Sequence, residues 1–155
     1  MTSRFADAET ARRAVALALP MLTASLTDRD VGESRCMHIV VMDPCSPFGT
    51  GTFEEAILYE HSLPSPESWD ADYAYYAREK ARIAWRTQAD SGVVATQSPH
   101  LLVAGDMALA GGIVLDGIVV AVSGANGWYD EAFARCIAAL LRAAAIGHAH
   151  AAHRP

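Results

Sequence analysis

Two groups of polar residues in this 155-residue sequence have types and positions suited to holding a small anion. Ser123 and Gly124 follow a run of β-branched residues, and Asn126 stands just before a helical pattern with acidic residues in its first turn. Free backbone N–H groups at a helix start bind carboxylates. Lys80 lies within a separate helical pattern of tyrosine and alanine, where poor solvation would make it a pocket cation. We therefore predict that Ser123, Gly124 and Asn126 form an anion cradle with Lys80 as its counter-charge.

Both features also have ordinary structural explanations. A glycine turn followed by a helix cap is common in proteins that bind nothing at that position. A lysine among apolar positions can extend its ammonium group to solvent from the edge of the core. The sequence leaves both alternatives open for Ser123 and for Lys80.

Four further residues could take part in chemistry at such a site. His100 follows a Ser-Pro pair in an expected loop, and a neutral imidazole can ligate a metal or act as a general base. Glu55 is a second candidate for acid–base chemistry. Tyr76 could stack on a flat ligand, and Arg82, one of a row of arginines at four-residue spacing, could recognise a carboxylate. Packing in the core or a solvated surface is the commoner role for each of these residue types.

Composition and charge argue against several classes of partner. The chain carries a net charge of −6 with only 12 Lys and Arg residues, so we expect no nucleic-acid partner, which would need a basic face. Its apolar stretches are interrupted well before the roughly 20 residues that span a membrane, so we expect no membrane partner. The N-terminus has no apolar signal region, and the three cysteines show no metal-binding spacing. We expect a cytoplasmic protein with free thiols.

The hydrophobic periodicity predicts helices and strands in a mixed order. The expected helices cover residues 7–26, 69–88 and 128–146, and the expected strands cover residues 36–43, part of 52–61, 111–115 and 118–123. Residues 90–99 are expected to form a loop, and residues 101–104 a short extended piece.

The end of the chain is predicted to lie outside this domain. Gly147 is expected to end the last helix, as glycine commonly does, and residues 148–155 to form a flexible histidine-containing tail. The order of elements then predicts a single α/β (α+β) domain over residues 1–147, in which helices flank an antiparallel sheet.

The second half of the chain carries short motifs in a fixed order. They are Gly111-Gly112, Asp116-Gly117, Val122-Ser123-Gly124 and Asp130-Glu131-Ala132, preceded by Lys80-Ala81. In this order and spacing they resemble the GlcG/HbpS-like haem-degrading domain family. The resemblance implies a profilin-like fold, a homo-oligomer and a small-molecule ligand, with haem as the cofactor of several members.

Three functions remain open at this point. The resemblance implies that haem or a related tetrapyrrole binds near a subunit interface, with Lys80 or an arginine at a propionate and His100 as the iron ligand. The alternative is a cytoplasmic enzyme that acts, without a metal, on a small carboxylate from aromatic or glycolate-type catabolism, with His100, Lys80 and Glu55 as catalytic residues. A second alternative is a non-catalytic oligomeric accessory protein.

Overall fold

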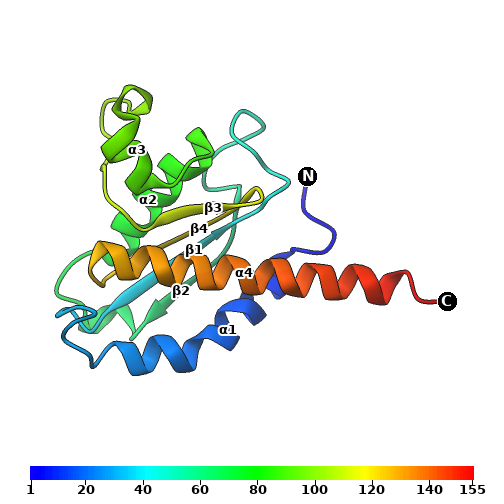
Figure 1. Cartoon of the computed structure of the whole chain (residues 1–155), viewed down its shortest axis with the longest axis horizontal. Coiled ribbons are helices and arrows are strands. Elements are labelled where there is room, and N and C mark those ends of the chain that lie inside the picture. Colours follow the sequence, from blue (N-terminus) through cyan, green and yellow to red (C-terminus); the bar gives the residue numbers. More distant parts are fainter.

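A four-stranded antiparallel sheet in the order β2-β1-β4-β3 forms the centre of the fold (Figure 1). The computed structural model describes all 155 residues. The strands are β1 (Met37–Met42), β2 (Ile57–Leu63), β3 (Gly112–Leu115) and β4 (Ile118–Ser123), and the helices are α1 (Ala8–Ser25), α2 (Tyr73–Thr87), α3 (Ser91–Gln97) and α4 (Gly127–Ala152), with short 3-10 turns η1 (Pro66–Ser68) and η2 (Pro99–Leu101). Helices α1 and α4 cover one face of the sheet, and α2 covers the other with α3 beside it. The predicted single-domain α+β class is confirmed.

The two central strands, β1 and β4, are buried along their full length because helices cover both of their faces. Met37, Ile39 and Val41 of β1 join the core beneath α1 and α4. Val40 and Met42, which point to the opposite face, join the core beneath α2. A strand covered on both sides needs such a continuous apolar run.

Helix α4 combines a buried first half with an exposed second half. Phe133, Ile137 and Leu141 pack against the sheet and α1, and the rest of the helix extends past the sheet (Figure 1). Its length and composition would allow it to cross a membrane. Its first half packs on the sheet, and 28% of its most apolar stretch is buried. The cytoplasmic location and the absence of a membrane partner stay predictions.

The loop predicted over residues 90–99 is wrong, because this segment contains α3. Its glycine, valine and threonine residues have low helix propensity. Hydrogen bonds to distant parts of the chain hold it instead, since the Ser91 hydroxyl donates to Leu109 O at 2.6 Å and accepts from Gly112 N at 2.9 Å. The extended piece predicted over residues 101–104 is also absent, and η2 ends within it.

The helix end predicted at Gly147 is wrong as well. Helix α4 continues to Ala152, so residues 148–152 of the predicted tail are helical. Gly147 has open space around its Cα, and the alanine-rich sequence after it favours more helix.

Candidate functional site

A cavity of about 290 Å³ lies where α2 crosses the end of β4. Its walls come from α2, from the corner between β4 and α4, and from residues just before β1 and β3. Its polar lining includes Ser34, Tyr73, Tyr76, Lys80, Ser123 and Asp130. We refer to it as the Lys80 cavity, because the lysine is the only one in the chain and lies at the centre of the polar contacts.

Helix α2 supplies three of these side chains from one face. Tyr73, Tyr76 and Lys80 are spaced three and four residues apart, which aligns them along the helix. Asp72 caps the start of the helix, because its carboxylate accepts from Tyr75 N at 3.0 Å. Lys80 is only 3% exposed, so it is a core residue and not a side chain that reaches solvent.

The corner between β4 and α4 brings backbone close to Lys80. Gly124 has a φ of +138°, and a Cβ there would lie 2.0 Å from Cys36 O. Gly111 has a φ of +131°, and a Cβ there would lie 2.9 Å from Lys80 Nζ. Only glycine fits at both positions. These two motif glycines therefore let the strands close around the lysine.

A buried ion pair forms the floor of the cavity. Lys80 Nζ donates to Asp130 Oδ2 at 3.0 Å and to Val122 O at 3.1 Å, and both charged side chains are at most 4% exposed. An ammonium group has three donors, so one N–H of Lys80 remains for a ligand. Burial raises the pKa of Asp130, while the Lys80 charge and backbone N–H groups oppose that rise.

The predicted anion cradle is partly occupied by the chain itself. Asp130 Oδ1 accepts from Ala125 N at 2.9 Å, so the carboxylate of Asp130 uses the backbone donor that an external anion would need. The backbone N–H of Asn126 donates to Val31 O at 2.8 Å, and its amide nitrogen donates to Asp30 O at 3.0 Å. Asn126 thus holds the preceding loop and does not line the cavity.

Two hydroxyl groups in the cavity have no hydrogen-bond partner within the chain, those of Ser123 and Tyr76. The neighbouring Tyr73 differs, because its hydroxyl donates to Asp70 Oδ1 at 2.6 Å. Burial and the Asp70 contact raise the pKa of Tyr73 to about 12. The free groups that face a ligand are therefore neutral hydroxyls and one ammonium N–H.

Besides Asn126, three predicted site residues lie elsewhere. His100 is exposed on η2 and does not line the Lys80 cavity. Arg82 stacks over the Phe53 ring at 4.2 Å and pairs with Glu54 and Glu79 at 3.5 Å.

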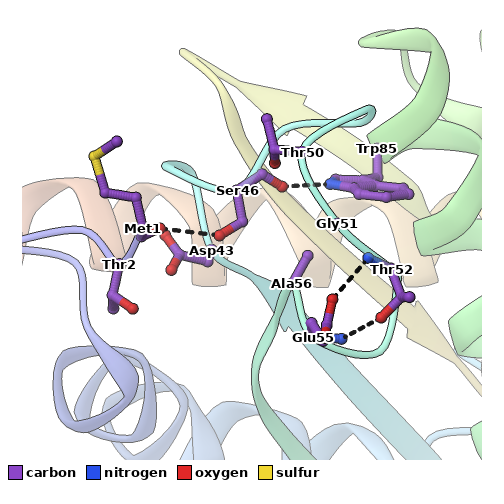
Figure 2. A pocket seen from close by; sticks show the side chains of 10 residues that line it. All are labelled: Met1, Thr2, Asp43, Ser46, Thr50, Gly51, Thr52, Glu55, Ala56 and Trp85. Atoms are coloured by element: carbon purple, nitrogen blue, oxygen red, sulfur yellow. Dashed lines mark hydrogen bonds between the residues drawn. The ribbon is translucent and has the colours of Figure 1, made fainter.

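Glu55, the third of these residues, lines a different cavity, shown in Figure 2. The structure thus brings together Lys80, Tyr76, Ser123 and Gly124 from the predicted set.

Sequence reasoning missed Asp130 as a site residue. The sequence analysis places it only in the first turn of a helix and in a family motif, yet it lies three, four and seven residues before Phe133, Ala134 and Ile137, which are all buried. An acidic residue in phase with a buried stripe predicts an inward-pointing carboxylate. That signal was available in the sequence.

Comparisons with known proteins support the fold. No protein-family model matches the sequence, and no curated protein matches it. The structure is similar to a solved structure described as protein ORFY of Klebsiella pneumoniae, with the family model DUF336. The match has a TM-score of 0.50 and 17% identity, and it covers 82% of this chain and 89% of that one. At this identity the likeness shows a shared fold.

Proposed function

We propose that the chain binds a small organic acid in the Lys80 cavity. One observation carries the proposal: Lys80 keeps a free N–H in a cavity that also holds the unpaired hydroxyls of Ser123 and Tyr76. A volume of about 290 Å³ is near the lower end of small-molecule sites. The sequence motifs and the shared fold with a DUF336 protein, a GlcG-like family, support a ligand-binding protein of that type.

The free donors favour a hydroxy acid over other small molecules. A carboxylate can accept from Lys80 and from the Ser123 hydroxyl, and such charge-assisted hydrogen bonds are the stronger ones. The Tyr76 hydroxyl can then donate to, or accept from, a second polar group of the ligand. Because Asp130 already neutralises Lys80, a singly charged acid suits the cavity better than a strongly anionic one.

The cavity residues do not fit a histidine-ligated haem. A histidine-ligated haem needs an axial imidazole, and no histidine lines the cavity. The Ala125 N–H that a propionate could use is engaged by Asp130. For this reason the proposed ligand is the smaller acid.

A metal-free enzyme on the same acid is a second candidate, favoured by one observation. Burial raises the pKa of Asp130, which brings a cavity carboxylate closer to the range of a general acid or base. Turnover would convert the bound acid, whereas a binding protein would release it unchanged.

The test is a calorimetric titration with glycolate, lactate, malonate and succinate. We expect saturable binding of a hydroxy acid. Tyr76→Phe and Ser123→Ala should each weaken it by about 0.5–1.5 kcal/mol, the usual contribution of a hydrogen bond. Tyr75→Phe is the matched control, because Tyr75 is exposed and outside the cavity.

A second readout follows Lys80 directly. Since it is the only lysine, its side-chain ammonium gives one unambiguous ¹⁵N resonance, which should shift on binding. The same samples, followed by NMR over hours, distinguish turnover from simple binding. Binding that is unaffected by the Tyr76 and Ser123 variants, or a response to haem and to none of the acids, would contradict the proposal.

A further inference from the structure

Lys80 carries a nitrogen atom that can form a covalent bond as well as hydrogen bonds. It lines the Lys80 cavity, and its Nζ donates to Asp130 Oδ2 at 3.0 Å and to Val122 O at 3.1 Å. Its third position has no partner within the chain. A lysine amine enclosed in a protein can add to a carbonyl carbon once it has lost a proton. The reactivity of Lys80 therefore depends on a neighbouring group that can take this proton.

Asp130 is placed to take the proton from Lys80. The 3.0 Å between Oδ2 and Nζ is a hydrogen-bond distance, along which a proton can pass directly. Burial raises the pKa of Asp130 to about 6, against the opposing effect of the Lys80 charge. This carboxylate is therefore a stronger base than one in water. Proton transfer replaces two buried charges by a neutral amine and a neutral carboxylic acid, and burial favours neutral forms.

The backbone holds the end of the Lys80 side chain in place. A Cβ at Gly111 would lie 2.9 Å from both Cδ and Nζ of Lys80, so the chain there packs directly against the end of the side chain. Lys80 is 3% exposed, and the open space that it meets is the cavity. A nucleophile fixed beside a binding cavity loses little further freedom when it reacts.

We propose that Lys80 forms an imine with a small 2-oxo acid, in which the carbonyl group is bonded directly to the carboxylate. The inference rests on the proposed function, because the same cavity must first bind the carboxylate. On binding, the carboxylate accepts from Lys80 and from the Ser123 hydroxyl, as for other acids in this cavity. In the imine it keeps the Ser123 hydroxyl and can accept from Tyr76. A hydroxy acid binds in the same way, but it has no carbonyl carbon that the amine can attack.

The reaction balances without any reagent beyond the 2-oxo acid. Asp130 takes one proton from the ammonium group of Lys80, and Nζ forms a bond to the carbonyl carbon. A second proton moves from the nitrogen to the carbonyl oxygen, which becomes a hydroxyl. Asp130 returns its proton to this hydroxyl, the C–O bond breaks, water leaves, and the electron pair of the nitrogen forms the C=N bond. The product is a positively charged imine nitrogen beside ionised Asp130, so the buried ion pair is restored.

Reductive trapping tests the proposal on the full chain. Cyanoborohydride converts an imine into a stable amine, so incubation with pyruvate or glyoxylate should add one group to Lys80, which peptide mapping by mass spectrometry locates. Lys80 is the only lysine, and the N-terminal amine of the fully exposed Met1 is the only other primary amine. Met1 is therefore an internal reference for unassisted reaction. We expect Lys80 to be trapped faster than Met1, because its carbonyl partner is held beside it.

Two conservative variants connect the trapping to the cavity. Tyr76→Phe and Ser123→Ala should each slow trapping on Lys80 by about two- to tenfold, because each removes one hydrogen bond to the carboxylate. Neither should change trapping on Met1. Tyr75→Phe is the matched control, because Tyr75 is exposed and outside the cavity. These variants leave Lys80 and Asp130 in place, so the buried ion pair that stabilises the site is kept.

The results distinguish the imine from simple acid binding. Faster trapping on Lys80 than on Met1, slowed by the Tyr76 and Ser123 variants, supports the imine. Trapping on Met1 alone, equal trapping on both amines, or trapping on Lys80 that neither variant slows overturns it. Calorimetric binding of pyruvate or lactate with no trapping on Lys80 overturns the imine and leaves the acid-binding function standing. Loss of both binding and trapping overturns both.

Discussion

The ammonium of Lys80 and the carboxylate of Asp130 are 3.0 Å apart and almost completely withdrawn from solvent. Removing two charges from water is costly, and the attraction between them repays that cost only when each keeps its partner. Val122 O and Ala125 N complete the hydrogen bonding of the pair. The stability of the site therefore depends on both charges being present together.

Asp130→Asn should lower the free energy of unfolding at neutral pH by about 3 kcal/mol, because it leaves Lys80 charged and buried without a counter-ion. Urea denaturation measures this loss. The double variant Lys80→Met with Asp130→Leu should lose much less, since an apolar pair of similar size needs no counter-charge. Asp116→Asn is the control, because Asp116 pairs with Arg142 in solvent and should change little. Equal losses in the single and double variants would contradict this account.

The sequence predicted part of the site because motif residues lie close along the chain. Ser123 and Gly124 could be placed at a strand end, and Lys80 and Tyr76 on one helix face, from local patterns alone. His100 could not be assigned, because its position depends on α3 and η2, which tertiary hydrogen bonds hold. Local periodicity carries no information about such contacts.

At the scale of elements, a polar network ties the edge strand β2 to its neighbours. Glu60 on β2 accepts from His38 Nε2 of β1 at 3.1 Å and from Arg78 Nε of α2 at 2.7 Å. Burial raises the pKa of Glu60, but the hydrogen bonds from His38 and Arg78 outweigh this effect and lower the pKa to about 2. Ionised Glu60 thus links three elements.

This link gives a defined dependence of stability on pH. The folded-state pKa of Glu60 lies below its ordinary value of 4.5, so its contribution is complete above about 4.5 and is lost as the pH falls toward about 2. Urea denaturation across this range should show a steeper loss in the native chain than in Glu60→Gln. Glu33→Gln, at an exposed position outside every ion pair, should behave like the native chain. Parallel pH profiles for the native chain and Glu60→Gln would contradict the prediction.

Elements with strong local signals were predicted well, and those held by distant contacts were not. The hairpin of β3 and β4 around Asp116-Gly117 is confirmed, because its turn and its strand pattern are both local. The first half of α4 follows its apolar stripe in the same way. Helix α3 has no such stripe, and its hydrogen bonds to residues 109–112 cannot be read from its own seven residues.

At the scale of the whole molecule, the Lys80 cavity and the cavity lined by Glu55 lie at opposite ends of β1 and share α2 as a wall. The packed domain that contains them extends along α4 only as far as Leu141, because no residue after Leu141 is buried. The last turns of α4 make only weak contacts with the rest of the domain, such as the 3.5 Å approach of His148 Nδ1 to Thr10 Oγ1. The predicted homo-oligomer stays a prediction.

Removing residues 148–155 should change the free energy of unfolding by less than about 0.5 kcal/mol, the range expected for exposed surface. Urea denaturation of the shortened chain beside the full chain measures the difference. The acid titration should also be unaffected. A larger loss would show that the last turns of α4 stabilise the domain.

The internal pairing of Lys80 with Asp130 also determines how a ligand reaches the cavity. Because the pair is neutral as a unit, it gives an incoming acid no attraction at long range, and the net charge of −6 repels an anion as it approaches. Association of the acid with the protein should therefore be slow, and its rate should rise as salt screens that repulsion. Selection among acids then depends on the short hydrogen bonds made after arrival, and so on how long each acid stays bound.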